Sequence, residues 1–341
     1  MKKRVLSLIA VLAMSFSLVA CGSAPAAQES APAAETTEVA EEATSTSANE
    51  KLVVGFAQIG QESGWRDAET NDIQWYAARN TDTIELVFAD AQQKQENQIK
   101  AIRNFIEMGV DVIAFPPVVE TGWEAVLTEC KEAGIPVILV DRGVDESCQD
   151  LYTCLIASDF IWEGEQAAEI MAQAIGGSGK IVELEGTVGA SAATDRKTGF
   201  DDYMAANYSD IEIVASQTGD FTRVLGKEVM ESFLKSYDDI AGVYCHNDDM
   251  ALGAIEAIKE AGLKPGEDVK IIGVDGVKGA FDAMVAGEMN GTVECNPCLA
   301  EQIFETAKIL KDGGSVEKWV KSIDGVYTMD QAADVIDSRT Y

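Results

Sequence analysis

The feature that most constrains the fold of this chain is a repeated alternation of short apolar runs with helical patterns. The apolar runs are rich in Val and Ile and predict strands. They span residues 52–59, 83–90, 110–117, 135–142, 152–159, 180–186, 211–218, 240–247, 269–276 and 290–297. Most segments between them carry apolar residues at three- and four-residue spacing, as in 96–109, and several end in glycine. This alternation predicts right-handed crossovers and parallel sheets, and the continuously apolar strands predict sheets covered on both faces.

The number of these units predicts two lobes. There are too many strands for one compact sheet, and no fixed period indicates a solenoid. The chain from about residue 51 onward is long enough for two domains. A polar loop at residues 141–150 leads into the next strand without the expected helix, so we expect the chain to change lobes at about residues 153–157. We therefore predict an α/β protein with two doubly wound, Rossmann-like lobes.

The first fifty residues set the expected compartment. Basic residues at the start precede an apolar stretch that ends in small residues before Cys21. This pattern predicts an export signal at residues 1–20, and it is too short for a membrane-spanning helix. It resembles a bacterial lipoprotein box, which implies that Cys21 is lipidated and anchors the protein to the outer face of the cytoplasmic membrane. Residues 21–50 are mainly Ala, Ser, Thr, Pro and Glu, so we expect a disordered acidic tether.

The net charge excludes two classes of partner. The chain carries a formal charge of −32 at pH 7, and loss of the basic signal residues makes it more acidic still. Such a field repels nucleic acid and anionic lipid. We therefore expect no nucleic-acid partner, and contact with a membrane only through the N-terminal lipid anchor.

Polar side chains gather where the predicted strands end. In open parallel sheets, ligands bind beyond the carboxyl ends of the strands. In this chain those positions carry carboxylates, guanidinium groups, an amide and aromatic rings. The residues that we expect to contact a ligand there are Glu62, Trp65, Arg66, Asp141, Arg142, Arg196, Phe221, Asn247 and Asp275.

This combination of side chains suits a small polyhydroxylated ligand. Asp and Asn accept hydrogen bonds from hydroxyls, Arg donates in a fork, and the C–H face of a sugar packs on an aromatic ring. Helix capping and surface ion pairing are the alternatives for each charged residue. We favour capping or an indirect role for Asp90, Asp248 and Asp249. Asp67 and Glu69 fit the first turn of a helix, where the macrodipole favours acids.

Several long stretches resemble one known family. They include VGFAQIGQESGWRDAET at residues 54–70, ADAQQKQENQIKAIRNFI at 89–106, ELEGTVGASAATDRKTGF at 183–200 and HNDDMALGAIEAIKEAGLKPG at 246–266. These stretches are similar to the sugar-binding proteins of ABC transporters, within the ribose-type periplasmic-binding family. The similarity runs from about Leu52 to Pro297.

The resemblance implies a periplasmic-binding-protein type I fold, in which three hinge strands join two lobes that close over one sugar. The implied N-terminal lobe comprises residues 51–155 and about 277–294, and the implied C-terminal lobe comprises 156–276 and about 295–341. By position, the resemblance implies ligand contacts from Glu62, Ser63, Gly64, Trp65 and Arg66, from Asp141 and Arg142, and from Arg196, Asn247 and Asp275.

The resemblance also implies the partners. The ligand is a monosaccharide, with a galactofuranose-like sugar favoured and ribose, arabinose or galactopyranose as alternatives. The permease subunits of an ABC transporter receive it. We expect a monomer that needs no cofactor and no metal.

The cysteines raise separate questions. Cys148 and Cys154 lie close together in the sequence of an exported protein, which allows a small disulfide; free thiols are the alternative. Cys295 and Cys298 form a C-x-x-C without a second pair or a neighbouring histidine to complete a zinc site, so we expect a buried thiol pair. We expect Cys130 and Cys245 in the core.

Other function classes receive less support. A glycosidase needs a defined carboxylate pair, and the sequence selects none. The single histidine, His246, has no nucleophile and orienting group evident beside it, so we expect a structural residue and no enzyme. A sugar-responsive transcriptional regulator of the same fold would need a DNA-binding helix pair at the N-terminus, where this chain has an export signal. A sensor that presents bound sugar to a receptor is a compatible variant of the transport role.

Overall fold

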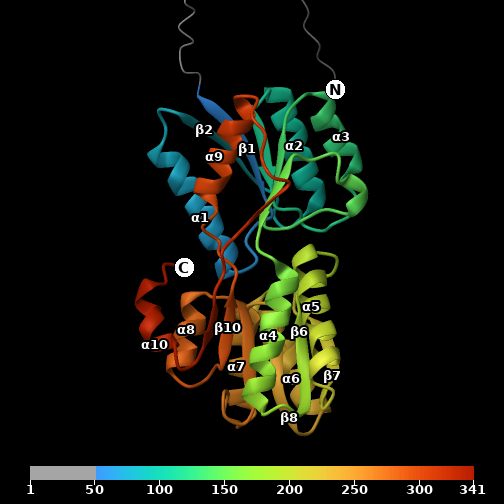
Figure 1. Ribbon diagram of the computed structural model, residues 1–341, viewed down its shortest axis with the longest axis vertical. Coiled ribbons are helices and arrows are strands. Elements are labelled where there is room, and N and C mark those ends of the chain that lie inside the picture. Colours follow the sequence, from blue (N-terminus) through green and yellow to red (C-terminus); the bar gives the residue numbers. More distant parts are fainter. Residues whose placement is uncertain (1–50) are drawn as a thin grey trace, which may run out of the picture. The chain divides into compact units, whose positions relative to one another are not determined.

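A computed structural model describes residues 51–341 of the chain (Figure 1). The predicted signal peptide, the lipidation site at Cys21 and the tether lie outside the described residues. In the described part, no helix combines the length and the apolar character needed to cross a bilayer. The elements there form two lobes, each built around a six-stranded sheet.

The first sheet has the strand order β11-β5-β4-β3-β1-β2, and all its pairings are parallel. Its strands are β1 (Leu52–Gln58), β2 (Ile84–Asp90), β3 (Val112–Phe115), β4 (Val137–Val140), β5 (Cys154–Ala157) and β11 (Trp319–Lys321). The helical elements of this lobe are α1 (Gly64–Arg79), α2 (Gln95–Met108), α3 (Glu124–Glu132), the 3₁₀ turn η1 (Glu146–Cys148) and α9 (Ala300–Lys311).

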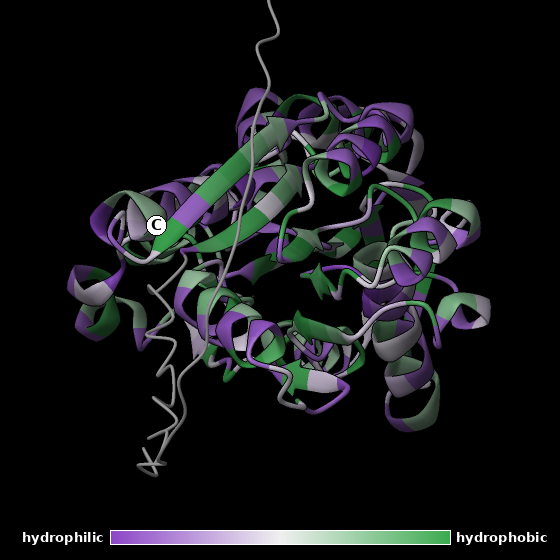
Figure 2. Ribbon diagram, turned by 90° about the horizontal axis from the view of Figure 1, so that it is seen from above, coloured by the Kyte–Doolittle hydropathy of each residue, from purple (hydrophilic) through white to green (hydrophobic). Residues whose placement is uncertain are grey.

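Alternate side chains of these strands build a core on each face of the sheet. Val54 and Phe56 of β1 pack with residues of α1 and α9 on one face. Ile113 and Phe115 of β3 pack with residues of α2 and α3 on the other. Helices cover both faces of this sheet, and strands covered on both faces are mainly apolar. Figure 2 shows the strands coloured mainly as hydrophobic.

The second sheet has the order β12-β10-β9-β8-β6-β7, parallel except for the β10–β12 pair. Its strands are β6 (Gly179–Glu185), β7 (Ile211–Thr218), β8 (Ile240–Cys245), β9 (Lys270–Asp275), β10 (Gly291–Glu294) and β12 (Val326–Thr328). The helical elements are α4 (Phe160–Ile175), α5 (Ser191–Asn207), α6 (Arg223–Ser236), α7 (Asp248–Glu260), α8 (Lys278–Val285), α10 (Ala332–Val335) and the 3₁₀ turn η2 (Ile336–Ser338).

Helices α4 and α5 approach each other through glycine. A Cβ atom on Gly164 would lie 2.3 Å from the carbonyl oxygen of Arg196, and one on Gly199 would lie 2.1 Å from that of Ile161. No other residue fits at these distances, so the two backbones touch directly. This contact holds the first half of α5, which carries Arg196, against the first half of α4.

The prediction of two α/β lobes is confirmed, and each of the ten predicted runs contains a strand. The chain crosses between the lobes three times, after β5, after β10 and after β11 (Figure 1). Strands β11 and β12 were not expected, because three-residue strands carry no readable period.

The expected division of the C-terminal part between the lobes was wrong. Residues 277–294, expected in the N-terminal lobe, form α8 and β10, and β10 pairs with β9 of the second sheet. Within 295–341, expected in the C-terminal lobe, α9 packs on the first sheet and β11 pairs with β5. The lobe of a segment depends on which strand it pairs with, and a short apolar strand fits either sheet.

The possible disulfide between Cys148 and Cys154 is also wrong, since both thiols are free and buried. Cys148 packs in the cluster on one face of the first sheet and Cys154 in the cluster on the other. In the C-x-x-C, Cys295 is buried and Cys298 is exposed, and both are free. The expected buried pair is therefore only half correct. Cys130 and Cys245 lie in the core as expected.

A buried ion cluster around Glu183 of β6 ties three elements of the second lobe together. Its carboxylate accepts hydrogen bonds from Lys197 of α5, from Ser216 of β7 at 2.5 Å, and from Nε2 of His246 at 2.9 Å. His246 Nδ1 accepts from the backbone N–H of Gly186, so the ring has a structural role, as predicted. Burial opposes the charge of Glu183, but its hydrogen bond with His246 and the charge of Lys197 outweigh it and lower the pKa of Glu183 to about 2.

This depressed pKa predicts a defined acid sensitivity. Stability from Glu183 is fully present above its unfolded pKa near 4.5 and is lost as the pH falls toward 2. We expect the difference in unfolding free energy between wild type and Glu183→Gln to narrow by about 2 kcal/mol between pH 6 and pH 3. Urea unfolding at both pH values measures it, with Glu212→Gln, exposed on β7, as the control. A difference that stays constant with pH would contradict the assignment.

Candidate functional site

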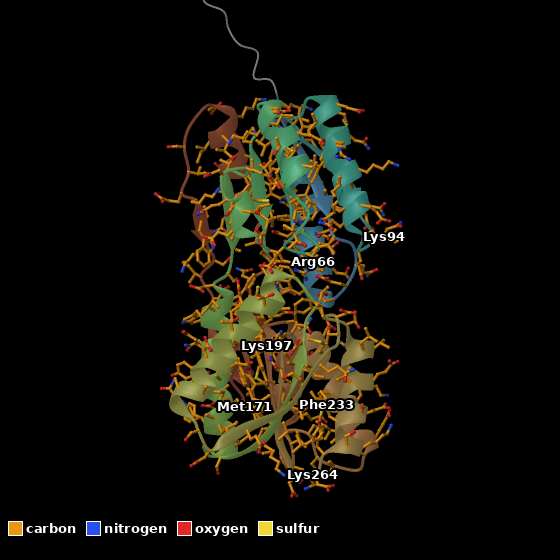
Figure 3. All side chains as sticks on the ribbon, turned by 90° about the vertical axis from the view of Figure 1, so that its right-hand side faces the viewer. Arg66, Lys94, Met171, Lys197, Phe233 and Lys264 are labelled. Atoms are coloured by element: carbon orange, nitrogen blue, oxygen red, sulfur yellow. The ribbon has the colours of Figure 1, made fainter. Side chains whose placement is uncertain are left out.

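A small cavity lies where the two lobes meet, beyond the carboxyl ends of the strands. Figure 3 shows Arg66 in the region between the two lobes. The lining residues come from both lobes: Glu62, Ser63, Trp65, Arg66, Asp141, Arg142, Ala192, Arg196, Phe221, Asn247, Asp275 and Cys295. The structure thus brings together every residue predicted to contact a ligand except Gly64. Ala192 and Cys295 were missed, because neither side chain carries a polar or aromatic group typical of a sugar contact.

Arg66 is the centre of the first-lobe side of the cavity. Ser63 caps α1 by accepting from the backbone N–H of Arg66, which fixes the start of the helix. The Arg66 guanidinium then donates to Glu62, Glu69 and Asp141. Burial opposes its charge, but the three carboxylates outweigh burial and raise the pKa of Arg66. The sequence predicted that Arg66 contacts a ligand, whereas in the structure its donors mainly form hydrogen bonds to these three carboxylates.

Glu69, predicted as a first-turn acid of the helix, lies beyond the first turn of α1. It is fully buried and accepts from Arg66 and from the Gln58 side chain at 2.9 Å. Burial raises its pKa, against the charge of Arg66. The residue was misassigned because α1 turns this face of its first turns toward the first sheet, and its sequence has no clear apolar face that would have revealed the orientation.

A carboxylate and a guanidinium, from Asp141 and Arg142, line the cavity directly after β4. Asp141 has a φ of 59°, a conformation that is unusual outside glycine and that turns the chain sharply after the strand. Arg142 follows and donates from Nη2 to Glu62 at 2.6 Å. Its guanidinium lies 5.0 Å from the centre of the Phe221 ring. The Nε and Nη1 atoms of Arg142 are buried and have no hydrogen-bond partner in the protein.

Arg196 of α5 is the corresponding cation of the second lobe. It donates from Nε to Glu163 at 2.7 Å and from Nη1 to the carbonyl of His246 at 2.6 Å, and Nη2 lies 3.6 Å from Asp275. Burial raises the pKa of Glu163 to about 7, against the attraction of Arg196. Burial likewise raises the pKa of Asp275, whose φ is 123°. Arg196 thus keeps one side of its fork toward the cavity.

Asn247 lines the cavity and also has a structural role. Its side-chain oxygen accepts from the backbone N–H of Met250 at 2.9 Å, which caps α7. Its amide donates to the carbonyl of Phe221 at 3.0 Å and so holds the loop whose ring faces the cavity. Asn247 therefore combines a place on the predicted cavity wall with the capping alternative.

Trp65 forms a wall of the cavity that belongs to both lobes. It sits on α1 of the first lobe but packs in the core cluster of the second. Its indole N–H donates to the carbonyl of Cys295 at 2.5 Å, beside the second crossing. The Arg66 guanidinium lies 4.7 Å from the ring centre. The lobes are therefore in contact, and the cavity lies between them.

The predicted indirect residues bind groups of the protein itself. Asp90 accepts from the backbone N–H of Gln92, and Asp248 accepts from the backbone of Gly276 and Val277 and from Thr292. Asp249 binds the backbone of Gly64 in the other lobe. None of the three lines the cavity. Gly64 likewise lies outside it, which corrects its expected position at the ligand.

The chemistry of the cavity favours recognition of an uncharged polar ring. Unpaired guanidinium donors come from one lobe, carboxylates from both, and two aromatic rings flank the space. His246 has both ring nitrogens bound to the protein, so it is not available as a base. Within residues 51–341, no group of three or more His, Cys, Asp and Glu side chains could hold a metal ion.

Comparisons with known proteins place this geometry in context. A family model described as periplasmic binding protein domain matches residues 54–314. The galactofuranose-binding protein YtfQ of Escherichia coli K12 is 47% identical over 293 residues, which cover 84% of this chain and 91% of that protein.

Solved structures of similar proteins agree with the fold. A Mycobacterium smegmatis protein in complex with β-D-fucofuranose is 50% identical with a TM-score of 0.81, covering 85% of this chain and 95% of that one. The binding component of the arabinose ABC transporter of Shewanella sp. ANA-3, bound to α- and β-L-arabinofuranose, is 48% identical with a TM-score of 0.81, covering 84% and 95%.

The buried cluster around Arg66 predicts a large loss of stability on substitution. Arg66→Met leaves Glu62, Glu69 and Asp141 buried without their shared cation, so we expect a loss of about 3–5 kcal/mol of unfolding free energy. Arg103→Met removes an exposed pair with Glu129 and serves as the control, with little expected change. Urea unfolding compares the two variants. Equal effects would show that the Arg66 cluster does not stabilise the fold.

Proposed function

Since the chain belongs to the periplasmic binding protein domain family, we propose that it is an extracytoplasmic receptor that captures one monosaccharide between its two lobes. The favoured ligand is a galactofuranose-like sugar, that is, a five-membered ring. The closed protein then docks on the permease of an ABC transporter and delivers the sugar. The matched relatives are solute-binding proteins and not enzymes, as the sequence predicted.

One observation carries this proposal: the buried, unpaired Nε and Nη1 donors of Arg142 in the cavity. A buried donor without a partner costs about 1–3 kcal/mol, and more when it is charged. Asp141 lies 3.6 Å from Nε, beyond hydrogen-bonding distance, and the bond from Arg142 to Glu62 uses Nη2 instead. Nε and Nη1 point to different sides of the guanidinium, so two separate hydroxyl oxygens of a sugar would satisfy them.

The walls of the cavity suit a single sugar ring. Trp65 and Phe221 each offer an aromatic surface for the C–H groups of the ring. Asp141 and Asp275 offer acceptors from opposite lobes, so closure over the ligand adds contacts that neither lobe supplies alone.

The ring form is proposed from the relatives. Three similar proteins are named or solved with galactofuranose, fucofuranose and arabinofuranose, which share a five-membered ring. Proteins at lower identity are named for ribose and fructose import. We therefore favour a galactofuranose-like furanose, and keep ribose, arabinose and galactopyranose as the alternative sugars to test.

The cellular role follows from the N-terminal pattern. Lipidation of Cys21 would hold the protein at the outer face of the cytoplasmic membrane, with residues 21–50 as the tether. Delivery to a permease then needs no diffusion away from the membrane. Presentation of the bound sugar to a receptor is the sensor variant of this role.

Calorimetry with ring-locked analogues tests the ligand. Free galactose interconverts between ring forms, whereas 1,4-anhydrogalactitol is fixed as a five-membered ring and 1,5-anhydrogalactitol as a six-membered ring. We expect the five-membered analogue to bind at least tenfold more tightly, and L-arabinose and D-ribose are titrated beside them. The reverse preference would overturn the furanose proposal, and no heat with any of these sugars would overturn sugar binding.

The role of Arg142 has its own test. Arg142→Met keeps the unbranched apolar part of the side chain and removes the donors, so we expect at least a 100-fold loss of affinity, because each charge-assisted bond contributes about 1.5–3 kcal/mol. Arg103→Met on the surface is the control and should bind like wild type. Affinity unchanged in Arg142→Met, with the protein folded by circular dichroism, would remove the observation on which the proposal stands.

A further inference from the structure

A hydrogen bond outside the cavity joins the two lobes. The backbone N–H of Gly64, the first residue of α1, donates to Asp249 Oδ2 at 2.7 Å. Asp249 lies on α7 of the second lobe, and 185 positions separate it from Gly64. Neither residue lines the cavity. The contact therefore joins the lobes without touching the ligand space.

The start of α1 is suited to receive a carboxylate. The first N–H groups of a helix have no partner within it, and the helix dipole concentrates positive charge there. The Ser63 side chain satisfies the N–H of Arg66 but not that of Gly64. Asp249 supplies the missing acceptor from the other lobe. In an open form, only water would replace it.

Arg223 of the second lobe holds the side chain of Asp249 in place. Arg223 donates from Nε and Nη2 to Asp249 Oδ1 at 3.2 and 2.9 Å, while Oδ2 faces Gly64. Arg223 is the first residue of α6, where a positive charge opposes the helix dipole. Its bridge to Asp249 offsets that repulsion. The carboxylate is thus oriented within the second lobe before the lobes meet.

The contact also explains the glycine at position 64. A Cβ atom there would lie 3.3 Å from Asp249 Oδ2, closer than side chains usually approach. The φ of this residue is not in the left-handed region, so the backbone itself does not require glycine. The close approach of the carboxylate favours glycine, because a Cβ atom would push the carboxylate away by a few tenths of an ångström.

We propose that Asp249 is a latch: Arg223 holds its carboxylate, which accepts a hydrogen bond from the backbone N–H of Gly64 in the other lobe. The latch stabilises the closed arrangement of the lobes and so changes the affinity for the ligand indirectly. This rests on the proposed function for its effect on binding. A ligand that needs the closed form binds with an apparent Kd equal to the intrinsic Kd divided by the fraction of closed protein. Asp249 is therefore a positioning residue, and it makes no contact with the sugar.

The latch predicts effects on opening in the absence of sugar. Asp249→Ala removes the acceptor, and Gly64→Ala crowds it while keeping the charge. Glu96→Ala is the matched control, because Glu96 is an exposed first-turn acid on α2. Hydrogen–deuterium exchange of the peptide that contains residues 62–69, together with the radius of gyration from small-angle scattering, reports opening in sugar-free protein.

We expect faster exchange at Gly64 and a larger radius of gyration in Asp249→Ala and Gly64→Ala than in wild type and Glu96→Ala. We expect about tenfold weaker sugar binding, equivalent to about 1.4 kcal/mol, with saturating sugar restoring the compact form. Exchange and radius equal to those of Glu96→Ala in both variants would overturn the latch. If wild type binds no sugar, the proposed function fails, while the sugar-free measurements still decide the latch.

Discussion

The interaction on which the site depends is the burial of Arg66 among Glu62, Glu69 and Asp141. A guanidinium excluded from water persists only when carboxylates satisfy its donors. These three acids come from the loop after β1, from α1 and from the turn after β4. One cation therefore fixes the relative positions of three segments. Arg142, the neighbour of Asp141, inherits a fixed position and keeps two donors free for a ligand.

The second lobe repeats this arrangement with Arg196, held by Glu163 and the carbonyl of His246. In both lobes a protein acid orients the cation, so little side-chain entropy remains to be lost when a ligand arrives. The N-terminus of α7 takes part both in the cavity wall and in the contact between the lobes. Asn247 caps its own helix and borders the cavity, while Asp249 receives the first N–H of α1 from the other lobe.

Much of the site could be predicted because parallel sheets place the ends of their strands on one edge. That rule located Trp65, Asp141, Arg142, Arg196 and Asp275 from strand positions alone. It could not tell a ligand contact from an internal one. Glu69 was predicted as a first-turn acid favoured by the helix dipole and is buried against Arg66, and Gly64 was predicted as a ligand contact and faces Asp249. Those distinctions depend on which way a helix turns and on how closely the lobes approach.

The sequence by itself determined the alternation of strands and helices, the two lobes and the chemical character of the crevice, since these follow from local periodicity and from residue type. The tertiary structure alone decided that β10 joins the second sheet and α9 with β11 the first, because pairing partners for short apolar strands are chosen by long-range packing. The tertiary structure alone also decided that the Arg66 donors bind carboxylates of the protein whereas Arg142 keeps two donors unpaired. That outcome depends on distances between segments far apart in the chain.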